Sequence, residues 1–229
     1  YHGTGTGISA TAVTDASRDV GYVGTGNPTP ISSPPPGPDA YSESILAFNL
    51  RTGAIVWAFG PVHPHDLHDN DLFASPMRIK AGTREMIGEG GKDGVYYAVD
   101  ARGGKLIWRT VVDPGDPYAE LIGNAAYGGG RIFVPVFAGA HGALVALRAR
   151  DGAIAWSTKL GGVYEAPALW QNVVFDVDVN GTLAAFDAAS GRRLLTIHLR
   201  GHTYGRGPRV DGSTLYVAAG STLTSYAIR

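Results

Sequence analysis

The sequence predicts an all-β protein, a β-propeller with about four to five four-stranded blades in this chain. Two observations lead to this fold class. The 229 residues include 33 glycines and 14 prolines, which favour short strands joined by turns over helices. Short segments of one kind also recur at intervals of about 40 to 50 residues, which is typical of repeat folds. Four antiparallel strands in each repeat is the pattern of a propeller blade.

The recurring segments are hairpins that share a turn and a large apolar residue. They align on four glycines, Gly53, Gly104, Gly152 and Gly191. Four positions after each glycine stands Trp57, Trp108, Trp156 or Leu195. Before each turn, small alanines alternate with bulky apolar residues, which indicates a strand, and a second strand follows. We expect the large residues to wedge between adjacent blades.

The repeats predict a single, incomplete propeller domain over residues 1–229. Four blades are expected at about 8–60, 71–112, 124–160 and 164–199, and a partial blade at 203–229. The last repeat ends before its turn glycine and outer strand, and nothing in Tyr1–Ala12 carries the missing pattern. An open sheet edge exposes unpaired backbone groups. We therefore expect a missing amino-terminal half, or a second chain, to complete the propeller.

Composition excludes several classes of protein. The formal net charge of -1 lacks the basic surplus that drives binding to phosphate backbones, so nucleic acid is not an expected partner. No stretch reaches the roughly 18 to 20 apolar residues of a membrane span. The absence of cysteine excludes disulfides and cysteine-ligated metal sites.

Two loops interrupt the repeats, and each has more than one interpretation. The proline-rich segment Asn27–Tyr41 is either a solvated loop or a wall over a central site, and Asp113–Leu121 is a second such loop. The segment His63–Asp71 holds three histidines and three aspartates. These are either polar loop residues or ligands of a first-row transition metal.

Three short motifs follow one another in the first half of the chain. They are GTGN at Gly24–Asn27, DND at Asp69–Asp71 and KDG at Lys92–Gly94. In this order, and with the blade repeats, they resemble the motifs of PQQ-dependent alcohol dehydrogenases. The stretches Tyr41–Trp57 and Asp69–Met77 are most similar to the polyvinyl-alcohol-dehydrogenase-like branch. The resemblance covers nearly the whole chain.

This resemblance implies the carboxyl-terminal part of an eight-bladed propeller. It also implies pyrroloquinoline quinone (PQQ) at the propeller axis, a calcium or lanthanide ion beside the quinone, and oxidation of an alcohol. The implied substrate is a small-molecule or polymeric alcohol, and the implied location is periplasmic or secreted.

By the same resemblance, four residues form the site. Asn27 matches a metal ligand, Asp69 the catalytic base, Asp71 an additional carboxylate that binds a lanthanide in some members, and Lys92 the cation beside the quinone oxygens. Asp69 is also counted among the metal ligands, since hard cations take oxygen ligands. Each residue has a structural interpretation as well: Asn27 as a turn residue before Pro28, the aspartates as solvated loop residues, and Lys92 as an exposed hairpin lysine.

Two departures from the family pattern support a second hypothesis. Ser9 stands where the family usually has the tryptophan that stacks under the quinone, and the adjacent-cysteine disulfide of many members is absent. The family's acidic metal ligand normally comes from blades that precede Tyr1. The alternative is therefore a noncatalytic propeller that serves as a binding or assembly scaffold.

Overall fold

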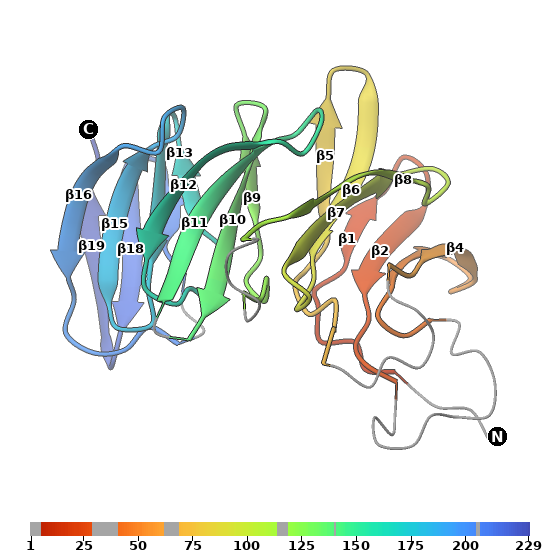
Figure 1. The fold of residues 1–229 in the computed structure, drawn as a ribbon, viewed down its shortest axis with the longest axis horizontal. Helices are drawn as coiled ribbons and strands as arrows, with labels where there is room; N and C mark the ends of the chain where they lie inside the picture. Colours follow the sequence, from red (N-terminus) through yellow and green to blue (C-terminus); the bar gives the residue numbers. More distant parts are fainter. Residues whose placement is uncertain (1–5, 29–40, 62–68, 114–118, 140, 205–206) are drawn as a thin grey trace. The chain divides into compact units, whose positions relative to one another are not determined.

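The fold is taken from a computed structural model that describes residues 6–28, 41–61, 69–113, 119–139, 141–204 and 207–229. These residues form five antiparallel sheets and no helix (Figure 1). They therefore contain no helix that could cross a membrane. The chain divides into two compact units, which we call unit 1 (Tyr1–Val111) and unit 2 (Val112–Arg229).

Unit 1 contains two four-stranded sheets whose strands pair in chain order. The first sheet consists of β1 (Val13–Asp15), β2 (Val20–Gly24), β3 (Ile45–Asn49) and β4 (Ile55–Phe59). The second consists of β5 (Met77–Ala81), β6 (Arg84–Gly90), β7 (Val95–Asp100) and β8 (Leu106–Val111). Every pairing of neighbouring strands is antiparallel, as a propeller blade requires.

Unit 2 contains two four-stranded sheets and one three-stranded sheet. The strands of the first are β9 (Ala126–Gly128), β10 (Arg131–Ala138), β11 (His141–Arg148) and β12 (Ile154–Leu160). Those of the second are β13 (Ala168–Trp170), β14 (Val173–Val177), β15 (Thr182–Asp187) and β16 (Arg193–His198). The third holds β17 (Arg209–Asp211), β18 (Thr214–Ala219) and β19 (Thr222–Ala227). The expected all-β repeats are confirmed, while the assignment of residues 1–229 to one propeller domain stays a prediction.

The predicted turn glycines adopt the same backbone conformation in all four hairpins. Their φ angles are +72° at Gly53, +67° at Gly104, +74° at Gly152 and +73° at Gly191, in the left-handed region that favours glycine. Hydrogen bonds between the side chain and the backbone of the turn explain why Asn or Asp is found at the start of such a turn. Asn49 Oδ1, for example, accepts hydrogen bonds from the backbone N–H groups of Arg51 and Thr52 at 3.0 and 2.9 Å.

The expected wedge between sheets is confirmed within each unit. A Cβ atom placed on Gly104 would lie 2.5 Å from the Trp57 ring, and one placed on Gly191 would lie 2.6 Å from the Trp156 ring. Each tryptophan therefore packs on the turn of the following sheet. The Trp156 indole also donates a hydrogen bond to the carbonyl of Ala188 at 3.1 Å.

The wedge is not formed at the last of the four positions. Leu195 is 47% exposed. The following sheet has three strands in the described part of the chain and lacks the hairpin turn that would cover this side chain. Exposure of Leu195 thus follows from the three-stranded form of the last sheet.

The apolar core lies between consecutive sheets, and an ion cluster supports it in unit 1. The core of unit 1 contains Tyr22, Ile45, Ala47, Leu72, Ile87, Tyr97, Val99 and Ala101. At its edge, the buried Asp15 carboxylate lies 2.5 Å from the Arg18 guanidinium and 3.1 Å from that of Arg78. Arg78 belongs to the second sheet, so this cluster joins the two sheets.

Replacing a turn glycine by alanine tests the wedge. Gly53→Ala introduces only the left-handed strain of about 1 to 2 kcal/mol, because nothing lies within 4 Å of the new Cβ. Gly104→Ala has the same strain and also overlaps the Trp57 ring, which we expect to cost about 1 to 3 kcal/mol more. Urea denaturation of both variants measures the difference. Equal destabilisation would contradict the wedge.

The ion cluster predicts an acid-sensitive part of the stability. The Ser17 hydrogen bond, with Arg18 and Arg78, lowers the pKa of Asp15 to about 2 against the opposing effect of burial. Because the folded pKa lies below the unfolded value of about 3.9, this stabilisation is present above that value and is lost as pH falls towards 2. Asp15→Asn should therefore destabilise the protein by about 1 to 3 kcal/mol at pH 7.

The matched control for this change is Asp211→Asn, which replaces an exposed aspartate and should have little effect. Urea denaturation at pH 7 and at pH 2 gives the free energy of unfolding of each variant. The difference in the free energy of unfolding between wild type and Asp15→Asn should be smaller at pH 2 than at pH 7. A difference in the free energy of unfolding that does not depend on pH would show that the carboxylate charge does not contribute to stability.

Candidate functional site

Three segments of unit 1 carry the four residues singled out in the sequence. Asn27 follows β2, Asp69 and Asp71 precede β5, and Lys92 lies in the turn between β6 and β7. Backbone hydrogen bonds hold these segments together. The Lys92 N–H donates to the carbonyl of Asp71 at 3.0 Å, and the N–H of the residue after Asp71 donates to the carbonyl of Thr25 at 3.3 Å.

The four side chains converge on one another. Lys92 Nζ donates hydrogen bonds to Asp69 Oδ1 at 2.8 Å and to Asp71 Oδ2 at 2.6 Å. Asn27 Nδ2 donates to Asp69 Oδ1 at 2.7 Å, and the Asn27 backbone N–H donates to Asp71 Oδ1. Residues far apart in the chain therefore meet in one group, which we call the four-residue cluster.

The cluster carries both signs of charge and is only partly exposed to solvent. The side chains of Lys92 and Asp71 are 15% and 13% exposed, whereas that of Asp69 is 64% exposed. Burial disfavours the charged form of Lys92, but its hydrogen bonds to both aspartates outweigh burial and raise its pKa. The Lys92 hydrogen bond is the main cause that lowers the pKa of Asp69, against burial. Both groups are therefore ionised at neutral pH.

The amide oxygen of Asn27 is a buried atom of the cluster. Asn27 Oδ1 accepts no hydrogen bond from the residues that the structure describes. A buried carbonyl oxygen without a donor is costly, and it is the kind of ligand that hard cations take. As an oxygen donor, it fits a calcium or lanthanide ion in its chemistry.

The cluster supplies only part of such a ligand shell. Calcium takes about six to eight oxygen ligands. Among the described residues, no group of three or more His, Cys, Asp or Glu side chains could hold a metal ion. Asn27, Asp69 and Asp71 therefore do not complete a cation site by themselves.

Phe73 belongs to this site although sequence reasoning missed it. Lys92 Nζ lies 5.3 Å from the centre of the Phe73 ring, within the range of a cation–π interaction. The signal was present in the sequence. In an extended segment, Asp69, Asp71 and Phe73 alternate onto one side.

Two glycines of the GTGN motif are explained by close packing. A Cβ atom on Gly26 would lie 3.0 Å from Asp71 Oδ1. One on Gly24 would lie 2.0 Å from Glu89 Oε1. Glu89 is 1% exposed, and burial raises its pKa well above the usual value, which favours the uncharged form of the acid. Side chains at either position would displace the loop that carries Asn27.

Other residues named in the sequence are not members of the cluster or lie outside the described residues. Ser9, which replaces the expected tryptophan, is exposed. The histidines of the His63–Asp71 segment and residues 29–40 of the proline-rich loop are not among the described residues. The competing interpretations of these segments therefore stay predictions.

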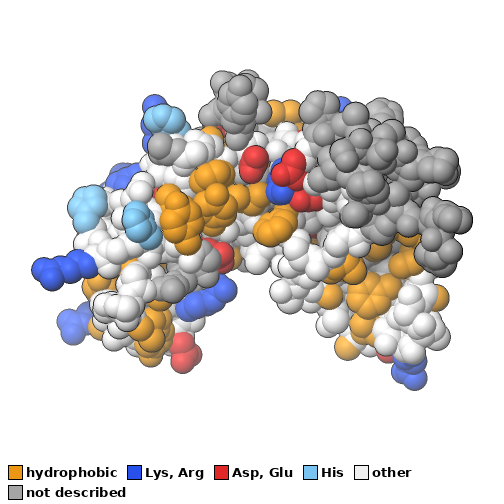
Figure 2. Space-filling view, turned by 90° about the horizontal axis from the view of Figure 1, so that it is seen from below, with side chains coloured by type: hydrophobic (Ala, Val, Ile, Leu, Met, Phe, Trp, Pro, Cys, Tyr) orange, Lys and Arg blue, Asp and Glu red, His pale blue; other side chains and the backbone are white. Residues whose placement is uncertain are grey.

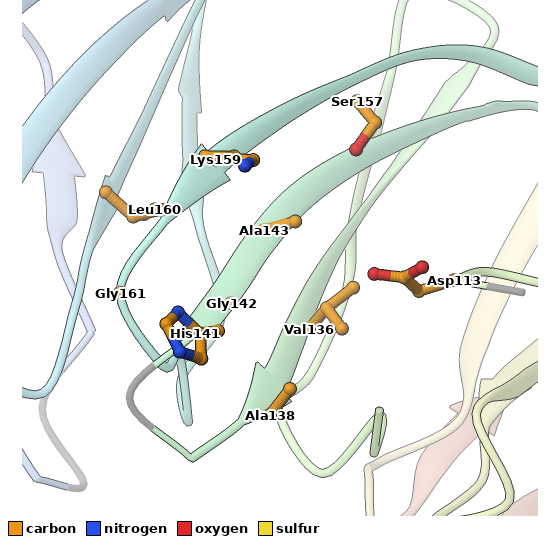
Figure 3. A pocket seen from close by; sticks show the side chains of 10 residues that line it. All are labelled: Asp113, Val136, Ala138, His141, Gly142, Ala143, Ser157, Lys159, Leu160 and Gly161. Atoms are coloured by element: carbon orange, nitrogen blue, oxygen red, sulfur yellow. The ribbon is translucent and has the colours of Figure 1, made fainter. Parts of the chain in front are cut away.

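A separate cavity of about 440 Å³ lies in unit 2. Figure 3 shows its lining, in which Val136 and Ala143 lie among Asp113, His141, Ser157 and Lys159. None of the four cluster residues lines it. Asp113 begins the second loop named in the sequence, and residues 114–118 of that loop are outside the described part.

Two family models match the sequence, and together they cover almost all of it. The model described as "Glucose/ethanol/alcohol dehydrogenase, beta-propeller domain" matches residues 2–126. The model described as "Outer membrane protein assembly factor BamB" matches residues 91–228. The chain belongs to the PQQ β-propeller family. Each match covers more than half of the chain, so the resemblance inferred from the motifs is confirmed.

Curated relatives of this family member are dehydrogenases. The chain is 32% identical over 132 residues to the polyvinylalcohol dehydrogenase of a Sphingopyxis strain, covering 50% of this chain and 19% of that protein. It is 28% identical over 223 residues to the quinoprotein alcohol dehydrogenase PedH of Pseudomonas putida, covering 79% of this chain and 36% of that protein. The chain thus spans well under half the length of these relatives.

Solved structures of the family share the fold of the chain. A europium-containing methanol dehydrogenase matches 93% of this chain and 50% of its own, with a TM-score of 0.77 and 17% identity. BamB from Moraxella catarrhalis matches 96% of this chain and 73% of its own, with a TM-score of 0.59 and 15% identity. At these identities the comparisons show the fold alone.

Removing the Lys92 charge tests the electrostatics of the cluster. Lys92→Gln leaves the mostly buried Asp71 carboxylate without its cation, so we expect a loss of about 1 to 3 kcal/mol in the free energy of unfolding at pH 7. The exposed Lys105→Gln is the matched control and should change little. Adding Asp71→Asn to Lys92→Gln should recover part of the loss. Equal effects of the two lysine changes, measured by urea denaturation, would contradict the ion pairing described here.

Proposed function

We propose that this protein is a quinoprotein alcohol dehydrogenase, or the carboxyl-terminal part of one, that oxidises an alcohol with PQQ and a calcium or lanthanide ion. The observation that supports this most directly is the convergence of Asn27, Asp69, Asp71 and Lys92. Three segments separated by tens of residues bring together the oxygen and ammonium groups that such chemistry needs.

Each member of the cluster has a proposed role. Asn27 Oδ1 and the carboxylates of Asp69 and Asp71 would hold the cation, because their oxygens are hard ligands. Lys92, kept protonated by the two aspartates, would donate hydrogen bonds to the quinone oxygens. PQQ, when bound, supplies the acceptor for the two electrons that leave the alcohol.

Asp69 is the proposed general base. It is the most exposed of the three charged side chains, so an alcohol hydroxyl can reach it. Its lowered pKa keeps it ionised and able to accept the hydroxyl proton, although a low pKa also makes it a weaker base. Its basicity therefore depends on how strongly Lys92 holds its Oδ1 atom.

The remaining features of the enzyme are proposed from the relatives. The substrate would be a small-molecule or polymeric alcohol, and the protein would work in the periplasm or outside the cell. An amino-terminal half or a second chain would supply the missing cation ligands and complete an eight-bladed propeller. The chain spans only a small part of the length of its relatives, which supports this view.

A noncatalytic scaffold is the second candidate function. The family model described as an outer membrane protein assembly factor matches residues 91–228, and Ser9 stands where the quinone-stacking tryptophan is expected. Fold by itself does not choose between an enzyme and a binding platform. The two candidates differ in whether PQQ binds.

Reconstitution separates the two candidates. The 229-residue protein is titrated with PQQ by calorimetry, with and without Ca²⁺ or La³⁺, and dye reduction is followed with simple and polymeric alcohols. We expect cation-dependent binding, weakened about tenfold or more by Asn27→Ala. Asp69→Asn should lower turnover by about 100-fold or more, the usual contribution of a general base.

Asp211→Asn is the control, because it removes an exposed aspartate outside the cluster. It should leave both PQQ binding and turnover unchanged. Absence of PQQ binding together with absence of turnover would reject an enzyme formed by this chain alone.

A further inference from the structure

Unit 2 contains loops that are equivalent to those of the four-residue cluster but lack its charges. In unit 1 the Lys92 N–H donates to the carbonyl of Asp71 at 3.0 Å. In unit 2 the Val179 N–H donates to the carbonyl of Gly162 at 2.9 Å, in the corresponding turn between β14 and β15. Val179 thus occupies the position of Lys92, and Gly162 that of Asp71. The repeat keeps the backbone and replaces the ion pair by two uncharged residues.

The aromatic residue of the cluster is kept where the charges are lost. In unit 1 a buried residue is followed by an aromatic one, Leu72–Phe73. The same arrangement occurs in unit 2 at Val163–Tyr164 and at Thr203–Tyr204. Thr203 also repeats the backbone bond of Leu72, since its N–H donates to the carbonyl of Val179 at 3.3 Å. An aromatic side chain therefore recurs at this position in three of the described loops, while Ile122 takes it in the loop before β9.

In unit 2 these aromatic side chains form a continuous row. The ring centres of Phe137 and Tyr164 are 4.2 Å apart, those of Tyr164 and Tyr204 are 5.7 Å apart, and those of Tyr204 and His202 are 6.0 Å apart. We call these four residues the aromatic row. Tyr204 is 61% exposed, and Phe137 and Tyr164 are half-buried. Figure 2 shows hydrophobic side chains gathered beside histidines on the left of the face in view.

The backbone beneath the row is held firmly. Thr203 is 3% exposed, and its hydroxyl donates a hydrogen bond to the carbonyl of Asp178. His202 Nδ1 lies 3.2 Å from the carbonyl oxygen of Val179, and the Gly220 N–H donates to the His202 carbonyl at 2.9 Å. Exposed rings on a fixed backbone lose little conformational entropy when a ligand binds.

We propose that the aromatic row is a binding site for the carbon chain of a polymeric alcohol. The choice of a polymeric alcohol as occupant rests on the proposed function. The site itself is independent of the four-residue cluster and of any cofactor.

The chemistry of the row favours an uncharged chain that bears hydroxyl groups. The faces of the rings present apolar surface to CH and CH₂ groups, while the tyrosine hydroxyls and the imidazole offer hydrogen bonds at their edges. Burial, with smaller effects of Tyr204 and Glu120, raises the pKa of Tyr164, so its hydroxyl keeps its proton at neutral pH. None of the four side chains in the row is a carboxylate, an ammonium or a guanidinium.

The extent of the row favours a polymer over a small alcohol. The distance between neighbouring ring centres is as long as several carbon–carbon bonds. A short alcohol can therefore contact one ring at a time. A chain that lies along the row contacts successive rings at once, and its affinity grows with each contact.

Binding measured without PQQ tests this site separately from the proposed reaction. The 229-residue protein is titrated calorimetrically with polyvinyl alcohol. We expect binding that Tyr204→Ala weakens about tenfold, the equivalent of roughly 1.4 kcal/mol. Tyr216→Ala is the matched control, because Tyr216 is a 37% exposed tyrosine outside the row, and it should change the Kd by less than about twofold.

Three further ligands, polyethylene glycol, 2-propanol and a cello-oligosaccharide, give the test its specificity. Polyethylene glycol has a similar chain without side hydroxyls, and 2-propanol is a single unit of the polymer; both should bind at least about tenfold more weakly than the polymer. Thermal unfolding of each variant shows that the fold is retained. No binding of polyvinyl alcohol, equal effects of the two tyrosine changes, or tighter binding of a cello-oligosaccharide would overturn the proposal. Failure of alcohol oxidation with polymer binding intact would reject the proposed function alone.

Discussion

The packing of a tryptophan from one sheet against the glycine turn of the next is the contact on which the structure depends. A single four-stranded sheet has no core of its own, because its faces become buried only where they pack against a neighbouring sheet. Trp57 and Trp156 fill the space beside Gly104 and Gly191, where any side chain on the turn would collide with the indole. The exposed Leu195 shows the opposite case, since no complete hairpin follows it in the described residues.

This repeated packing gives the loops at one end of each blade a constant geometry, on which different chemistry can be placed. In unit 1 the loops carry Asn27, two aspartates and Lys92, and opposite charges stabilise one another in a partly buried setting. In unit 2 the equivalent backbone bond joins Val179 to Gly162. The same scaffold therefore presents a charged cluster in one unit and uncharged aromatic rings in the other.

The buried oxygen of Asn27 links the structure to the proposed chemistry. Its amide nitrogen and backbone N–H both donate to aspartates, while its carbonyl oxygen has no donor among the residues that the structure describes. Folding thus leaves this oxygen unsatisfied within the cluster, at some cost in stability. Sites that bind a cation commonly retain such atoms because the ion repays the cost on binding.

The sequence by itself determined the strands, the turn glycines and the repeat, because these follow from alternation and from the left-handed backbone that glycine adopts at Gly53 and its equivalents. It also named the four residues of the cluster, through motifs in a fixed order. Only the tertiary structure decided that those side chains touch, that Phe73 lies beneath the Lys92 ammonium, and that aromatic rings from one strand and two loops of unit 2 form one row. Such contacts depend on which loops the sheets bring side by side, and the spacing of residues along the chain does not predict which loops become neighbours.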